Sequence, residues 1–281
     1  MIRRSVFTLI LSLGIAVTAA AETSERTNDL ALGEVSTRSA EEIQKRLITK
    51  SYTFTEAQFR APAVPNNVVE LALNEVGSGS AAEMRKRIFN IPIMVLGAIF
   101  RREAIKRLPA SISQQRITSG KLLRRAEKII QPVLQLDNRD ERVELFLYQS
   151  KTPRAALWMG CVLILSDSLV ALLYGSDLMG IVAHELAHSY FMDEMVAAQK
   201  TNDERGMKVI ELKCDAVAML LLKLLGSDPI YHIRGVKMIV NRNPNNSFSG
   251  VPYLQSSGEL RTHPSVVERA VFAQRFVKLL T

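Results

Sequence analysis

Apolar side chains recur every three or four positions along much of the first half of the chain, as they do on one face of an α-helix. The clearest case is the stretch 119–136, in which Pro132 is expected to bend or shorten the helix. Its apolar positions are Leu122, Leu123, Ala126, Ile129, Ile130, Val133 and Leu134. The pattern predicts a helical N-terminal region over residues 22–136.

The pattern changes after residue 136. Two β-rich apolar runs, 143–148 and 161–165, are joined through a turn and a middle segment, 154–158. Together they predict a small antiparallel sheet. The predicted fold class is therefore α+β and predominantly α-helical, with residues 137–281 as a second region that packs with the N-terminal helices in one unit.

A helix is predicted beside this sheet, beginning near Gly175, with Ser176 or Asp177 as its N-cap. A second apolar helix is predicted over 211–225 and a last one over 265–280. The apolar positions on the buried side of the first of these helices are Leu178, Ile181, Val182, Leu186 and Phe191.

The helix that begins near Gly175 carries the sequence His184-Glu185-Leu186-Ala187-His188. Positions i and i+4 of a helix lie on one face, so both imidazoles can point at one ion, as in many Zn²⁺ sites. Glu185 is placed to take a proton from a water on such an ion. The same pattern also occurs by accident on ordinary core helices, so the motif alone leaves both interpretations open.

A catalytic zinc site usually has three protein ligands, so a third must come from elsewhere in the chain. Glu211 is expected to open the apolar helix 211–225 at its wet end, with Asp215 one turn further on. Unpaired charge there is costly, and a metal for Glu211 and a histidine N–H for Asp215 would remove that cost. Alternatively, the two are helix-start charges that the helix dipole favours. The other acidic candidates are Asp193, Glu194, Asp203 and Glu204.

The first 21 residues have the pattern of a secretory signal peptide. A short basic stretch, residues 1–4, precedes the uncharged run 5–17, and Ala19-Ala20-Ala21 fits a cleavage site. The run is shorter than the ~20 residues of a membrane span, although an uncleaved anchor is the alternative. We therefore expect an exported chain, periplasmic or else secreted, in which Cys161 and Cys214 either pair or remain two buried thiols.

The chain carries a formal charge of +8, and loss of Arg3 and Arg4 with the signal peptide would leave +6. Between positions 85 and 128 basic residues far outnumber Glu103 and Glu127. Such a face could attract an anionic membrane surface weakly, or be an ordinary solvated helix surface. Without interleaved aromatic residues or a nucleic-acid-binding module, no nucleic-acid partner is expected.

Several ordered motifs resemble the HtpX and CAAX-endopeptidase-like zinc peptidases. Besides the motif at 184–188, residues 211–218 (ELKCDAVA) are similar to the E-x-x-x-D-x-x-A element of that family. Thr262-His263-Pro264, with Arg269 after it, resembles the family's closing T-H-P…R signature. The likeness covers residues 155–269.

The resemblance implies a zincin-like core of gluzincin type with one Zn²⁺ per chain. It implies that His184, His188 and Glu211 are the ligands and Glu185 the general base. The chain departs from the family in having Met159-Gly160-Cys161 where Pro-Gly-Gly is usual. It also lacks a second apolar run long enough for the transmembrane helices that many members carry.

The resemblance places His263 at the active-site cleft, where its N–H could face the oxyanion of a tetrahedral intermediate. Pro264 biases His263 toward an extended backbone at the start of the last helix. Arg269, about one turn further on, would support the site from behind. The alternative is a histidine that only ties this helix down; a fourth zinc ligand would close the position that water needs.

The sequence thus predicts an exported zinc metalloendopeptidase that acts on polypeptides, and the soluble relatives suggest misfolded envelope proteins as substrates. The main alternative is a zinc-containing chaperone-like or binding protein that rarely cuts. A third possibility is a basic surface-binding protein that acts through residues 85–128.

Overall fold

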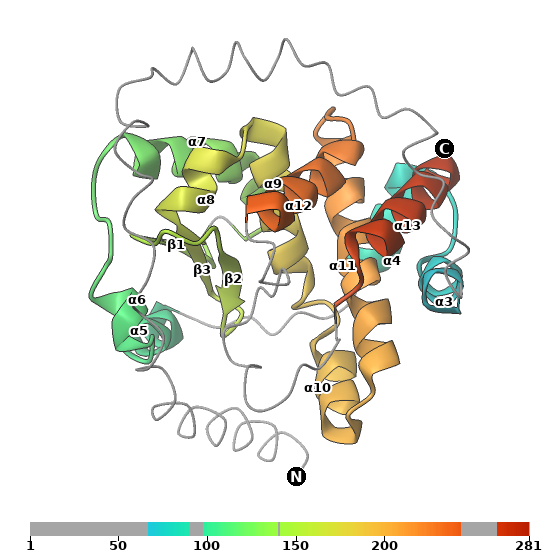
Figure 1. Cartoon of the computed structure of the whole chain (residues 1–281), viewed down its shortest axis with the longest axis horizontal. Helices are drawn as coiled ribbons and strands as arrows, with labels where there is room; N and C mark the ends of the chain where they lie inside the picture. The colour runs from blue at the N-terminus through green and yellow to red at the C-terminus, as the bar shows by residue number, and fades with distance from the viewer. Residues whose placement is uncertain (1–66, 90–97, 140, 243–262, 281) are drawn as a thin grey trace. The chain divides into compact units, whose positions relative to one another are not determined.

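The helix that carries the two histidines, α9 (Gly175–Ala187), is buried along most of its length. Every residue from Gly180 to Ala187 is buried, as is usual for a helix with packing partners on all sides. These partners are α7 (Lys121–Leu136), α11 (Glu204–Leu224), α12 (Ile230–Arg242) and strand β2 (Ala155–Trp158), as Figure 1 shows.

The computed structural model describes residues 67–89, 98–139, 141–242 and 263–280. All of them belong to one of the two compact units into which the chain divides. The predicted signal peptide, residues 1–21, lies outside the described residues, as does Thr262. Among the helices within those ranges, none combines the length and the apolar character that crossing a membrane requires.

The predicted N-cap of α9 is wrong. The helix begins at Gly175, after Tyr174, and no side chain caps it. Asp177 is instead buried inside the first turn, where Arg234 of α12 donates to its two oxygens over 2.7 and 2.8 Å. The Ser176 hydroxyl lies 3.1 Å from that of Ser227. Both candidate caps are therefore used in tertiary contacts.

The sheet has three strands, β1 (Glu144–Tyr148), β2 and β3 (Val162–Ser166), in the order β1-β3-β2. It is mixed and not antiparallel as predicted, because β1 pairs with β3 in parallel and β2 pairs with β3 antiparallel. The middle segment 154–158 is itself a strand at the far edge. The chain therefore turns back once more before β3 and enters β3 in the same direction as β1.

The long helix α11 begins earlier than predicted. Only Asn202 and Asp203 separate it from α10 (Met192–Thr201), and the Asp203 carboxylate accepts from the backbone N–H of Gly206 at 2.8 Å. This cap starts the helix two turns before Glu211, so Glu211 is buried in the interior of α11 and does not stand at its wet end.

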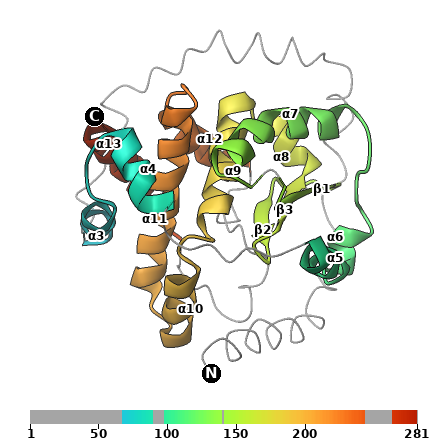
Figure 2. The same cartoon turned by 180° about the vertical axis from the view of Figure 1, so that it is seen from behind.

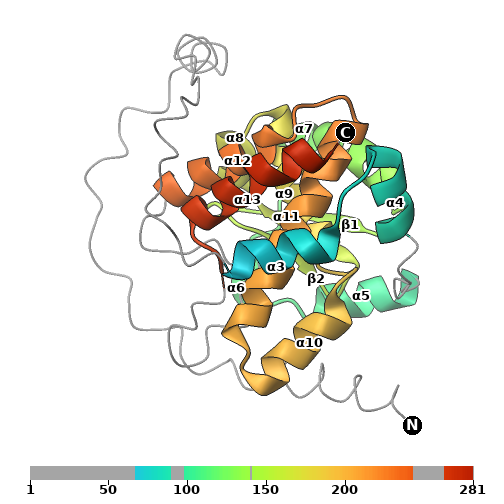
Figure 3. The same ribbon diagram turned by 90° about the vertical axis from the view of Figure 1, so that its right-hand side faces the viewer.

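Helices α3 (Asn67–Val76) and α13 (Val266–Leu279) pack against α11 and against each other, as Figure 3 shows, and α4 (Ala81–Phe89) also contacts α11. Lys213 of α11 links this helix to α3 and to α10. Its ammonium lies 2.9 Å from Glu75 of α3, 2.6 Å from Glu194 of α10 and 4.6 Å from the centre of the Phe191 ring.

On the other side of α9, α7 packs against both α9 and α8 (Asp167–Leu172), visible from behind in Figure 2. Pro132 lies inside α7 without ending it. Helices α5 (Ala98–Lys106) and α6 (Ala110–Ser113) contribute Ala104 and Ile112 to an apolar cluster with Phe146 and Ile164 of the sheet.

Several arginines of the basic stretch 85–128 bind backbone carbonyls of other elements. Arg85 donates to Leu136 O, Arg101 to Glu141 O, and Arg125 to Val170 O and Leu173 O. These side chains therefore serve the fold. Weak association with an anionic membrane, predicted from the same stretch, would have to rest on its remaining exposed lysines and arginines.

Two glycines allow α9 and α12 to approach closely. A Cβ at Gly180 would lie 2.8 Å from Cα of His232, and a Cβ at Gly235 would lie 3.2 Å from the carbonyl oxygen of Asp177. The close approach brings the His232 side chain of α12 toward α11.

We expect Gly180→Ala to lower the free energy of unfolding by about 1–3 kcal/mol, because the added methyl group forces α12 away from α9. Gly175→Ala on the same helix is the matched control, since no atom lies within 4 Å of a Cβ there. That variant should be as stable as the wild type or slightly more so. Equal stability of the two variants in urea unfolding would contradict the close packing.

Candidate metal centre

His184 and His188 lie one turn apart on α9 and are both buried. Their ring centroids are 5.0 Å apart and their planes are nearly perpendicular, at 89°. Each ring uses one nitrogen for a neighbour behind it: His184 Nδ1 lies 2.8 Å from Asp215 Oδ1, and His188 Nδ1 lies 3.5 Å from Cys214 Sγ. The Nε2 atoms of both rings therefore remain for a shared partner.

That shared partner is the carboxylate of Glu211 on α11. Its Oε2 lies 3.3 Å from His184 Nε2, and its Oε1 lies 3.7 Å from His188 Nε2. Such separations are long for hydrogen bonds. Two ligand atoms on one tetrahedral ion with bonds of ~2.0–2.1 Å are ~3.3–3.4 Å apart. The three side chains are thus spaced as ligands of a common ion would be, and their nearest ligand atoms all lie within 4.8 Å of one another.

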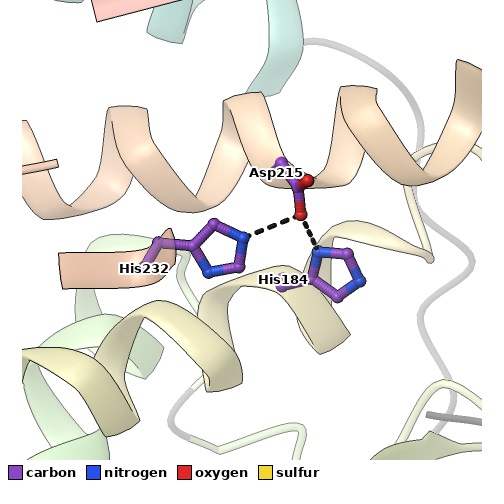
Figure 4. A group of neighbouring side chains, drawn as sticks. All are labelled: His184, Asp215 and His232. Atoms are coloured by element: carbon purple, nitrogen blue, oxygen red, sulfur yellow. Dashed lines mark hydrogen bonds and ion pairs between the residues drawn. The ribbon is translucent and has the colours of Figure 1, made fainter. Parts of the chain in front are cut away.

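A second group, His184, Asp215 and His232, also brings potential ligands together. Here a single oxygen, Asp215 Oδ1, lies 2.8 Å from His184 Nδ1 and 2.7 Å from His232 Nε2 (Figure 4). These are hydrogen-bond distances, and Arg269 donates to the same oxygen. Because these donors already surround the Asp215 oxygen, no place is left for a cation. We therefore interpret His184, Asp215 and His232 as a hydrogen-bonded network behind the group formed by His184, His188 and Glu211.

Asp215 is an ionised acceptor in that network. Burial alone would raise the pKa of its carboxyl group, but Arg269 and His232 outweigh burial and hold the pKa below its usual range. An ionised carboxylate can only accept, so the ring nitrogens of His184 and His232 that face it carry protons. The Nε2 of a neutral His184 is then left with a lone pair, as a metal ligand requires.

Glu185 is fully buried, and neither of its carboxylate oxygens has a hydrogen-bond partner among the described residues. Burial raises the pKa of Glu185 to about 8. A buried carboxyl group without a partner is costly, and a cation or water held beside it would satisfy it. This orphaned group indicates that a metal ion and its water fit the site.

The charges of the site favour a divalent cation. When Glu185, Glu211 and Asp215 are all ionised and the histidines are neutral, as metal binding requires, Arg269 supplies the only formal positive charge among the buried side chains around them in the described part of the chain. Three carboxylates and one guanidinium leave two negative charges, which one divalent ion balances. Buried histidine, aspartate and glutamate side chains could thus hold a metal ion here.

His263 and Arg269 both reach Glu211. His263 Nδ1 lies 3.3 Å from Glu211 Oε1, and Arg269 Nη2 donates to Oε2 over 2.7 Å. Burial alone would raise the pKa of Glu211, but His263, His184 and His188 outweigh it and hold the pKa well below the usual range. Arg269 comes from α13, whose first turn is fixed by a capping box between Ser265 and Glu268.

The structure thus brings together all seven side chains predicted for the site: His184, Glu185, His188, Glu211, Asp215, His263 and Arg269. Two of the four other acidic candidates serve elsewhere: Glu194 pairs with Lys213, and Asp203 caps α11. Cys161 and Cys214 are both buried free thiols, so the disulfide alternative is excluded.

Sequence reasoning missed His232, which is fully buried and bound to Asp215. Little in the sequence indicates a role for His232. The chain has only four histidines, and this one falls seventeen residues after Asp215 on an otherwise apolar helix face.

Comparison of the chain with models of known protein families finds no match, and comparison with curated proteins finds none either.

The pKa values of the two histidines predict how metal binding depends on pH. Burial lowers the pKa of His188 to about 4, so His188 is neutral at pH 7. Burial acts on His184 in the same direction, but the contact with Asp215 and the nearby Glu211 carboxylate outweigh it and raise the pKa to about 9. In the metal-free protein His184 is therefore protonated at neutral pH, and its Nε2 proton must leave when a metal binds.

We expect the apparent affinity for a divalent cation such as Zn²⁺ to rise at least tenfold for each pH unit between about pH 6 and about pH 8, and to level off above the pKa of His184. The sign follows because the protonated form, which dominates below that pKa, competes with the metal. Competition with a chelator of known proton affinity at each pH measures the slope. An affinity that does not change over this range would contradict His184 as a ligand.

Proposed function

We propose that this protein is a zinc-dependent endopeptidase with a zincin-like core, in which His184, His188 and Glu211 hold one Zn²⁺ and Glu185 is the general base. The observation that carries the proposal is the pairing of two features: ligand-like spacing of the three side chains, and a buried, unpartnered Glu185 carboxyl group beside them. The three side chains provide ligands for a metal ion, and Glu185 provides a base next to the water that the ion would hold.

The donor set favours zinc over other common ions. Two imidazoles and one carboxylate suit Zn²⁺, whereas Ca²⁺ and Mg²⁺ prefer oxygen ligands. Cys214 lies behind His188, against its Nδ1, and so does not belong to the set. Three protein ligands leave one position open, as is typical of catalytic zinc sites and not of structural ones.

When bound, Zn²⁺ supplies a Lewis acid that acidifies a water molecule and polarises a carbonyl group. Glu185 is placed so that its carboxylate would accept a proton from a water held beside it and would later deliver that proton to the leaving amine. Asp215 keeps the Nδ1 proton of His184 in place, and Arg269 holds Glu211 through Oε2. These two residues thus orient the side chains that would carry the ion.

Polypeptide substrates fit the sheet next to α9. Strand β2 packs against α9 and pairs, among the described strands, only with β3, so its other edge can accept an extended peptide. The turn from β2 to β3 has positive φ at Met159 (49°) and Gly160 (69°). Export to the periplasm, which rests on the signal-peptide pattern of residues 1–21, completes the proposal. A role in the turnover of misfolded envelope proteins rests on the sequence resemblance.

We propose that His263 donates its N–H to the oxyanion that develops during attack. Its position 3.3 Å from Glu211 supports a role inside the site. As a third imidazole near this carboxylate, His263 could instead serve as an additional metal ligand, and the His263→Ala variant distinguishes the two roles.

The Glu185→Gln variant should bind zinc and fold as the wild type does, yet lose nearly all peptidase activity, because the amide cannot take a proton. Glu127→Gln, an exposed glutamate on α7, is the matched control and should cleave at the wild-type rate. Zinc content and casein cleavage of the two variants provide the measurement. Substantial cleavage by zinc-loaded Glu185→Gln would remove Glu185 from this role.

The His263→Ala variant should keep stoichiometric zinc and its melting temperature, and lose roughly 10²–10³ in kcat, as removal of one oxyanion donor does. Metal analysis of the dialysed variant, together with initial rates on a peptide substrate, measures both. A variant that cuts at the wild-type rate, or one that sheds its zinc, contradicts the oxyanion role.

One observation favours the alternative of a zinc-containing binding or chaperone-like protein. His184, Glu185 and Glu211 expose at most 3% of their surface, so a substrate has little access to them in this conformation. Digestion of casein with and without a chelator separates the two functions. One zinc per chain without any chelator-sensitive cleavage would favour the binding protein.

A further inference from the structure

His232 of α12 is fully buried and lies directly behind the proposed metal ligands. Its Nε2–H donates to Asp215 Oδ1 over 2.7 Å, and its ring is stacked on that of His184, with centroids 5.5 Å apart and planes 17° apart. Figure 4 shows the two rings approaching the same carboxylate oxygen from separate helices. His232 thus contacts both the residue that orients His184 and His184 itself.

A histidine at this position leaves a polar atom unsatisfied. His232 Nδ1 is buried and has no hydrogen-bond partner in the part of the chain that the structure describes. A leucine would fill a similar volume without a bare nitrogen, so packing alone does not explain the residue. The contact made by Nε2 is the feature that only a hydrogen-bond donor can supply.

The backbone of the chain is arranged to bring this ring to Asp215. Gly180 of α9 faces His232, and any larger residue there would place its Cβ 2.8 Å from His232 Cα. The missing side chain lets α12 sit close enough for the imidazole to reach across α9 to α11.

Several donors compete for the carboxylate of Asp215, and their hydrogen bonds differ in strength. Arg269 donates to Asp215 Oδ1 and also holds Glu211, and hydrogen bonds from a charged donor are stronger than those from a neutral ring. Asp215 Oδ2 has no hydrogen-bond partner among the described residues. Without a further donor, the carboxylate could turn toward the guanidinium and bind it through both oxygens. Oδ1 would then move away from His184 Nδ1.

We propose that His232 is a positioning residue that keeps Asp215 Oδ1 on the Nδ1 proton of His184, so that His184 presents its Nε2 to the metal. This inference rests on the metal site of the proposed function, and it concerns how firmly that site binds its ion. His232 itself touches neither the ion nor the substrate.

Three variants of the full-length protein test this role. His232→Leu removes the donor and keeps most of the volume, and His232→Gln restores an N–H donor at a similar reach. Ile239→Ala is the matched control: Ile239 is buried on the same helix, about 10 Å further along at ~1.5 Å per residue, and away from Asp215. Zn²⁺ affinity is measured by chelator competition, and proton NMR of the zinc-loaded protein follows the Nδ1–H signal of His184.

His232→Leu should weaken Zn²⁺ binding by about 10–100-fold, as loss of the group behind a metal ligand typically does. The His184 Nδ1–H signal should shift or exchange faster in that variant. His232→Gln should bind Zn²⁺ nearly as tightly as the wild type. Ile239→Ala should lower the melting temperature and leave the Zn²⁺ affinity unchanged, which separates positioning from general loss of stability.

Wild-type affinity in His232→Leu would overturn the inference, as would a His232→Gln variant that is as weak as His232→Leu, because the donor would then not matter. A wild-type protein that binds no Zn²⁺ would overturn both this inference and the metal site. A protein that binds Zn²⁺, loses it in His232→Leu and cleaves no peptide would support the positioning role and contradict only the peptidase.

Discussion

Glu211 and Asp215 stand one turn apart inside the protein and share a single guanidinium, and much of the structure depends on this contact. Arg269 donates to Glu211 through Nη2 and to Asp215 through Nη1. An uncompensated buried charge costs several kcal/mol, so α11 can bury its carboxylates only where α13 docks beside it. The capping box at the start of α13 fixes the helix from which Arg269 projects.

The Arg269 guanidinium does not neutralise the negative charge of the site. One guanidinium cannot balance three ionised carboxylates, and Glu185 has no hydrogen-bond partner among the described residues. Protons can fill this deficit in the metal-free protein: burial raises the pKa of Glu185, and the neighbouring carboxylates of Asp215 and Glu211 raise the pKa of His184 against the effect of burial. A divalent cation would replace those protons. Metal binding, proton release and the orientation of His184 by Asp215 would therefore form one linked equilibrium.

Sequence patterns predicted those parts of the fold that depend on local periodicity. The helix around His184 and its buried side followed from apolar spacing. Motif spacing indicated His184, Glu185 and His188, whereas the remaining site residues were expected from the cost of buried charge and from the family resemblance. Sequence patterns did not predict the structure where contacts between distant parts of the chain determine it. The parallel pairing of β1 with β3 depends on a four-residue edge strand too short to show alternation. Asp177 has the composition of a cap but binds Arg234, and His232 reaches Asp215 only because Gly180 admits α12.

The central claim is that two imidazoles and one carboxylate form a common zinc site. X-ray absorption at the zinc edge of the zinc-loaded protein tests it most directly, because nitrogen and oxygen ligands lie at ~2.0–2.2 Å and sulfur ligands at ~2.3 Å. The account predicts a nitrogen and oxygen shell with the multiple scattering of two histidines from wild-type protein, and one histidine fewer from His188→Ala. A sulfur shell, which would place Cys214 on the metal, or an unchanged histidine signal in His188→Ala would contradict it.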